Sequence, residues 1–122
     1  MAAERYRAWA EQVQSLSDKT SLLECAHRED EIAARIESLY PDSAAIKDEI
    51  AAQNPKLAEL NSSLFAPYSL RDQFRLQARG ERLGATVWRT IAGKTSGPHA
   101  RQVFLDCALL EEASAEFLES LL

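Results

Sequence analysis

Five arginines between residues 69 and 92 recur mostly at three- and four-residue steps, so an α-helix would place them along one side. At about 100° per residue they fall within a stripe roughly 80° wide. They are Arg71, Arg75, Arg79, Arg82 and Arg89. Each guanidinium offers a planar fork of N–H donors that matches the oxygens of a carboxylate or a phosphate. We therefore predict that this arginine stripe binds a partner, either an acidic protein or, as the alternative, a nucleic-acid backbone.

Charge is segregated along the chain, whose formal net charge is −5. Residues 1–68 carry seven Lys/Arg against twelve Asp/Glu, residues 69–101 carry seven against two, and residues 102–122 carry none against five. Net acidity and the lack of aromatic residues among the arginines disfavour a nucleic-acid partner. Internal pairing is a further interpretation, in which acidic residues of the last segment neutralise the arginine stripe; these are Glu111, Glu112, Glu116 and Glu119.

Two glycines in the same stretch, Gly80 and Gly84, lie away from the arginines, and Trp88 follows one turn later on the same face. A glycine inside a helix costs about 0.5–1 kcal/mol relative to alanine, so some packing reason is expected. We predict that these three residues pack against a neighbouring helix that crosses closely at the glycines. The same face is expected to bury the long aliphatic side chains of the stretch, among them Leu76, Leu83, Val87 and Ile91.

The segment Gly93-Lys94-Thr95 matches the end of a phosphate-binding P-loop, but the rest of that motif is missing. Trp88 stands where the motif needs its first glycine, and no strand leads into the segment. We therefore interpret residues 93–98 as a loop between helices, with no nucleotide cofactor.

The two histidines are candidates for metal or acid–base chemistry. Glu24 and His27 have the Glu-x-x-His spacing of di-iron bundles, but the position that would complete a second motif with His99 is Ser96. His99 and Asp106 would share one side of the last helix, and no Ser or Cys nucleophile pairs with either histidine. We expect no catalytic residue, no metal and no cofactor, and hence a protein that is not an enzyme.

Composition favours helix throughout, with four Gly and four Pro in 122 residues. No apolar run approaches the roughly 20 residues that cross a bilayer, and the first residues lack the apolar core of a secretory signal. A cytoplasmic location without membrane contact is expected. Cys25 and Cys107 are too few for a disulfide framework or a zinc site, so we predict two buried free thiols.

Apolar periodicity and capping signals predict one all-α domain over residues 1–122. Ser21 with Glu24, and Ser69 with Asp72, fit the capping box that begins a helix. The expected helices cover residues 3–16, 20–40, 42–53, 55–65, 69–92 and 98–121, the second, fifth and sixth being the long ones. Glu29 falls inside an apolar face, which places it at the edge of that face or in a pair.

The predicted fold is therefore a helical bundle of about five or six helices. Apolar residues at heptad-like steps should form a buried seam on the last helix; they are Val103, Cys107, Leu110, Ser114, Phe117 and Leu121. We expect the short helices to turn Ile46, Ile50, Leu57, Leu60 and Leu64 inward. The predicted function is a non-enzymatic protein-interaction module such as an adaptor, an inhibitor or immunity protein, or an export chaperone. Wide apolar faces are compatible with a homodimer or a hetero-partner.

Overall fold

The computed structural model describes residues 2–122, which form α-helices and no strand. The helices are α1 (Ala2–Gln12), α2 (Leu16–Leu39), α3 (Ser43–Gln53), α4 (Leu57–Phe65), α5 (Leu70–Gly93) and α6 (Pro98–Ser120). The predicted all-α helical bundle is confirmed, and so are the positions of its three long helices. None of the helices in this part of the chain is both long and apolar enough to cross a membrane.

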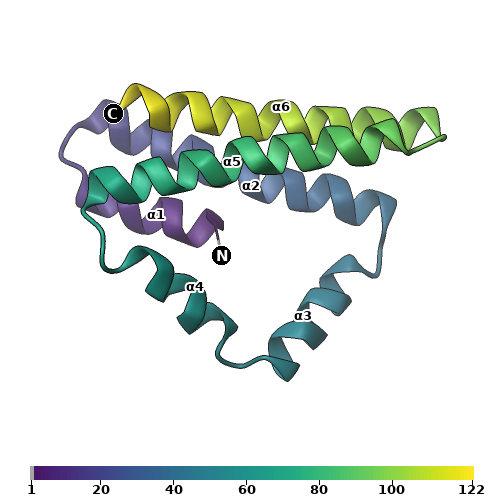
Figure 1. Ribbon diagram of the computed structural model, residues 1–122, viewed down its shortest axis with the longest axis horizontal. Helices are drawn as coiled ribbons and strands as arrows, with labels where there is room; N and C mark the ends of the chain where they lie inside the picture. The colour runs from purple at the N-terminus through teal and green to yellow at the C-terminus, as the bar shows by residue number, and fades with distance from the viewer. Residues whose placement is uncertain (1) are drawn as a thin grey trace.

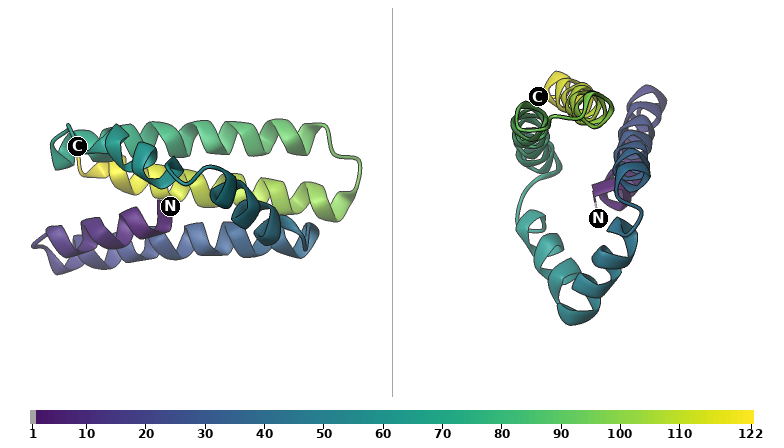
Figure 2. Two further views of the ribbon diagram at one scale, coloured as in Figure 1. Left: turned by 90° about the horizontal axis from the view of Figure 1, so that it is seen from below. Right: turned by 90° about the vertical axis from the view of Figure 1, so that its right-hand side faces the viewer.

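Four helices pack side by side, while two project away from them (Figure 1). α1 and α2 form one antiparallel hairpin, α5 and α6 form a second, and α2 packs on α6 to join the two. α3 and α4 form a V-shaped arm, as the end-on view in Figure 2 shows. The bundle proper is therefore α1, α2, α5 and α6.

Local capping decides where two of the long helices begin. The hydroxyl of Ser69 accepts a hydrogen bond from the backbone N–H of Asp72 at 3.2 Å, as its capping signal predicts. The predicted break between the first two helices is wrong: α1 ends at Gln12 rather than at residue 16, and α2 begins at Leu16 rather than near residue 20. Ser15 caps α2 instead of Ser21, accepting from the N–H of Asp18 at 3.3 Å, because this serine offers a cap six residues earlier and nothing before Ser21 breaks the helix.

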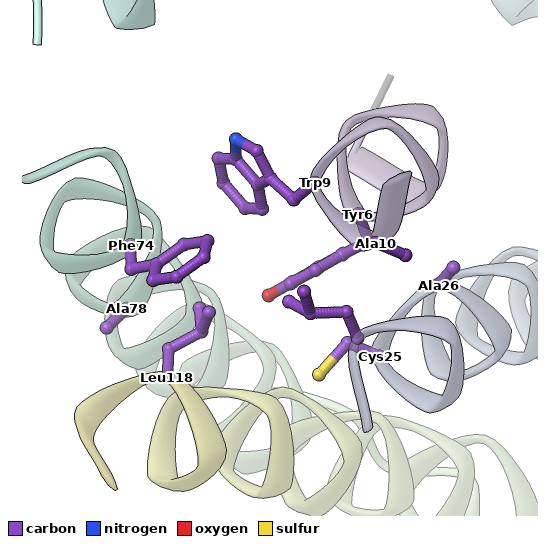
Figure 3. Packing of buried hydrophobic residues seen from close by; sticks show 9 residues of the cluster. Tyr6, Trp9, Ala10, Cys25, Ala26, Phe74, Ala78 and Leu118 are labelled. Carbon is purple, nitrogen blue, oxygen red and sulfur yellow. The ribbon is translucent and has the colours of Figure 1, made fainter. Parts of the chain in front are cut away.

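The larger buried cluster lies between the four helices of the bundle, with side chains from α1, α2, α5 and α6 (Figure 3). The ring of Trp9 meets those of Tyr6 and Phe74 edge to face, with centroids 5.5 and 5.2 Å apart. Such aromatic pairs contribute about 0.5–1.5 kcal/mol each beyond the area they bury. Tyr6 reaches from α1 towards the helices opposite, so its hydroxyl enters the interior, where a polar partner is required (Figure 3).

A second cluster lies towards the other end of the bundle. Ile32 of α2 packs with Val103 and Cys107 of α6, and the ring of Trp88 stacks on Phe104 at a centroid distance of 5.9 Å. The predicted seam on the last helix is confirmed, since its members are buried or partly buried. Both cysteines are buried and unpaired, as predicted.

The arm does not bury the side chains that were predicted to face inward. No residue of α3 or α4 is buried, and Ile46, Ile50, Leu57, Leu60 and Leu64 are all exposed. Their spacing does place them on apolar sides of short helices, but periodicity says nothing about whether another element covers that side. The prediction was therefore wrong about their burial.

The buried side of α5 also differs from the predicted one. Its interior positions are Phe74, Ala78, Glu81, Ala85 and Ala92. Small alanines let α6 approach closely, and the longer aliphatic residues are left on the other side, where Leu83 is 65% exposed. The prediction that these aliphatic residues are buried was wrong. Apolar periodicity favours the side with the largest apolar residues, whereas the side that packs depends on how well two helices fit together.

Candidate functional site

The arginine stripe is partly neutralised by α6. Arg82 forms a bidentate pair with Glu119, with N–O distances of 3.0 and 2.7 Å, and Arg89 pairs with Glu112 at 2.5 Å. Hydrogen bonds from the arginines hold the pKa values of both glutamates below their usual range. Two of the five arginines are thus paired with the acidic neighbours that the sequence suggested for internal pairing.

The other three arginines lie near the start of α5. Arg71 donates to the backbone carbonyl of Leu122, and Arg75 donates to Asp72 one turn earlier on its own helix. Within residues 2–122 Arg79 forms no ion pair or hydrogen bond. Arg75 and Arg79 also line a surface pocket of about 210 Å³, together with the side chains of Tyr68, Asp72 and Leu76.

An exposed row of aliphatic side chains runs beside these cations along α5. Its members, Leu76, Leu83, Val87 and Ile91, are 36–65% exposed. Gly80 lies within the row, and a Cβ built there would meet no atom within 4 Å. The structure therefore places no helix crossing at Gly80. We call the four aliphatic residues the α5 row, and no other helix within residues 2–122 covers them.

Three carboxyl groups converge inside the bundle from three different helices. Glu29 comes from α2, Glu81 from α5 and Glu111 from α6, and one oxygen from each lies within 4.8 Å of the other two. Glu81 is 1% exposed, and the other two are half-buried. We call these residues the carboxyl cluster.

Neutral donors hold the carboxyl cluster in place. The hydroxyl of Tyr6 and the amide of Gln77 both donate to Oε1 of Glu81, at 2.6 and 2.8 Å. The indole N–H of Trp88 donates to Oε1 of Glu111 at 3.0 Å. The second oxygen of Glu81, Oε2, is buried and receives no hydrogen bond within the part of the chain described. A buried polar atom without a partner is costly, and such exceptions in a folded protein call for an explanation.

Burial and mutual repulsion make these carboxyl groups hard to ionise. Desolvation, followed by the nearby Glu81, raises the pKa of Glu29 to about 7. Desolvation and a hydrogen bond with Glu81 raise the pKa of Glu111 to about 9. Carboxyl groups this close resist ionising together, so one oxygen holds a proton that its neighbour accepts. At neutral pH the cluster can therefore bind protons or another cation.

The second predicted glycine, Gly84, makes room for the carboxyl cluster. A Cβ at this position would lie 2.9 Å from both Cδ and Oε1 of Glu111 and 3.0 Å from its Oε2. The backbone of α5 thus forms one wall against the Glu111 carboxyl group. Trp88 packs on Phe104 and also orients Glu111, so one of the predicted packing residues contacts the cluster directly.

Sequence reasoning missed Glu81 and Glu111 as members of a common site. Two signals in the sequence pointed to it. Glu29 lies inside an apolar face, and Glu81 lies on the same side of its helix as Ala78 and Ala85, the side that turns out to be buried. The histidines lie elsewhere: His27 and His99 are both exposed and neither belongs to the cluster.

Comparison of the chain with protein-family models, with curated proteins and with solved structures finds no match.

Proposed function

We propose that this protein is a non-enzymatic interaction module that binds an acidic amphipathic helix of a partner protein along α5. One observation carries the proposal: the exposed α5 row lies directly beside Arg75 and Arg79. An apolar stripe with cations along its edge is complementary to a helix that has leucines on one side and carboxylates next to them. Such a surface would serve an adaptor, an inhibitor or immunity protein, or an export chaperone.

The spacing of the α5 row suits a helical partner. Counting Gly80, its positions follow one another at steps of four, three, four and four residues, close to the seam of a coiled coil. Because Gly80 has no side chain, a partner helix can approach the middle of the row closely. Each aliphatic side chain that becomes fully buried contributes up to about 1.5–3 kcal/mol, which must outweigh the entropy lost on association.

Charge supports an acidic partner over a basic one. Arg79 has no ionic partner within residues 2–122, and Arg75 has only an exposed neighbour on its own helix. Carboxylates of a docked helix would find these donors at the edge of the α5 row. The pairs of Arg82 and Arg89 with α6 leave fewer free cations for a phosphate backbone than the sequence pattern implied.

Two synthetic helices test the proposal. Both are amphipathic peptides of about three heptads with leucine at the seam positions, and one carries glutamate beside the seam where its twin carries lysine. Fluorescence anisotropy should show that the glutamate peptide binds at least about tenfold more tightly, a difference of roughly 1.4 kcal/mol. Val87→Asp and Arg79→Glu should each weaken that binding without loss of the far-UV circular dichroism signal.

Matched controls separate this function from the alternatives. Leu109→Asp changes an exposed leucine of α6 outside the α5 row and should leave peptide binding unchanged. Equal affinity for the two peptides, or binding insensitive to Val87→Asp, would refute an acidic helical partner. Tight binding to generic DNA that falls steeply with salt would instead favour the nucleic-acid alternative. A dimer that dissociates with Val87→Asp would show that a second copy occupies the surface.

A further inference from the structure

We propose that Glu29, Glu81 and Glu111 bind a divalent metal ion of oxygen preference between α2, α5 and α6. Three helices each supply one carboxyl group, and one oxygen from each lies within 4.8 Å of the others. Metal–oxygen distances are about 2.0–2.6 Å for Mg²⁺ and Ca²⁺, so three oxygens spread evenly around one ion are separated by at most about 4.5 Å. The observed limit of 4.8 Å is close to this spacing, so small rotations of the side chains bring the three oxygens onto one ion.

The buried oxygen Oε2 of Glu81 is the second, independent observation. It is enclosed in a residue that is 1% exposed, and no hydroxyl, amide or cationic group of residues 2–122 donates to it, so only a proton carried by the neighbouring carboxyl groups, or a metal in place of that proton, can satisfy it. The other oxygen of the same carboxyl group already accepts from Tyr6 and Gln77. These donors fix the orientation of the carboxyl group, and they leave Oε2 free to bind a metal.

The surrounding side chains resemble the outer shell of a metal site. Tyr6 and Gln77 orient Glu81, while the indole of Trp88 orients Glu111. Outer-shell hydrogen bonds of this kind fix ligand geometry in metalloproteins. Gly84 provides the space for Glu111, since any side chain at that position would displace the carboxyl group of Glu111.

Charge and donor chemistry define the class of ion. No arginine or lysine forms an ion pair with any of these three carboxyl groups in the part of the chain described. Arg5 acts on Glu29 electrostatically without pairing with it, so protons or a metal must balance the remaining charge. The donor set is entirely oxygen, without histidine, which suits Mn²⁺, Mg²⁺ or Ca²⁺ more than zinc or copper. Because ligation requires ionised carboxylates, the metal competes with protons.

Mn²⁺ is the probe for the test, because its free ion is counted directly by electron paramagnetic resonance. The chain, stripped with a chelator, is titrated with MnCl₂ at pH 6, 7 and 8. We expect one ion bound per chain, an affinity that rises at each higher pH, and a Tm that rises with added metal. Glu81→Gln should abolish binding, whereas the matched control Glu24→Gln, an exposed glutamate of α2, should not.

A second variant covers the case in which Glu81→Gln does not fold. Gly84→Ala should weaken Mn²⁺ binding at least about tenfold through displacement of Glu111, while the helical signal persists. Absence of saturable binding up to about 1 mM Mn²⁺ at pH 8, the weak end of biological sites, would overturn the proposal. So would binding that survives Glu81→Gln or, where that variant is unfolded, binding unaffected by Gly84→Ala. These outcomes are independent of the peptide test, which uses the opposite side of α5.

Discussion

The two sides of α5 invert the usual distribution of residue types. The interior side holds three alanines, a phenylalanine and a glutamate, while the outer side exposes the four aliphatic residues of the α5 row. Small interior residues let α5 and α6 approach, and the space next to Gly84 admits a carboxyl group rather than an aliphatic chain. The size of the apolar residues along a helix therefore does not identify the side that packs. Both candidate functions depend on this inversion. The proposed partner binds the exposed aliphatic residues, and the proposed metal binds the buried glutamate.

Truncation of a side chain should change the free energy of unfolding by very different amounts on the two sides of α5. Phe74→Ala removes a buried ring that packs on Trp9 and should cost about 3–5 kcal/mol of unfolding free energy. Leu83→Ala, on the outer side, should change it by no more than about 0.5 kcal/mol. Urea denaturation of both variants measures this contrast. A loss above about 2 kcal/mol for Leu83→Ala would mean that the outer side is packed after all.

The two glycines of α5 should respond differently to alanine. Gly84→Ala brings a methyl group to within 2.9 Å of the Glu111 carboxyl group, which must shift from its place beside Trp88, so this displacement should offset the gain in helix propensity. Gly80→Ala meets open space and should stabilise the helix by about 0.5–1 kcal/mol. Thermal unfolding distinguishes them, and a Gly84→Ala variant as strongly stabilised as Gly80→Ala would place Glu111 away from the helix.

Charge reversal along the arginine stripe should give the smallest effects. Arg82→Glu breaks the pair with Glu119 and should lower the Tm slightly at low salt, with a smaller loss at high salt. Arg79→Glu has no pair to break and should leave the Tm unchanged while it weakens peptide binding. Equal losses of Tm in the two variants would show that Arg79 is also engaged within the fold.

Local signals in the sequence predicted the helices well. The Ser69 cap, the Pro98 start and the seam of α6 each depend on neighbouring residues, so the chain itself carries the information. Whether the arm is exposed and which side of α5 is buried depend on which helices pack together, and periodicity does not give that information. The carboxyl cluster was missed for the same reason: Glu29, Glu81 and Glu111 are far apart in sequence, and only the bundle brings them together.

The burial of Glu81 beside two other carboxyl groups should make the stability of the fold depend on pH. Other titratable or charged groups act electrostatically on the cluster, and they include Arg5, Tyr6, Cys25, Asp30 and Cys107. The pKa values of Glu29 and Glu111 rise in the folded state to about 7 and about 9, against 4.5 as the reference value. The folded state then binds more protons than the unfolded state between those limits, so unfolding free energy must fall as pH rises.

The measurement is urea unfolding of the metal-free chain at intervals from about pH 5 to about pH 9. The structure predicts that stability declines steadily across this range, and that Glu111→Gln flattens the upper part of the decline because its amide does not titrate. Glu24→Gln, the exposed control, should follow the unmodified chain. A stability that is constant or rises over the same range, unchanged by Glu111→Gln, would contradict the buried carboxyl cluster.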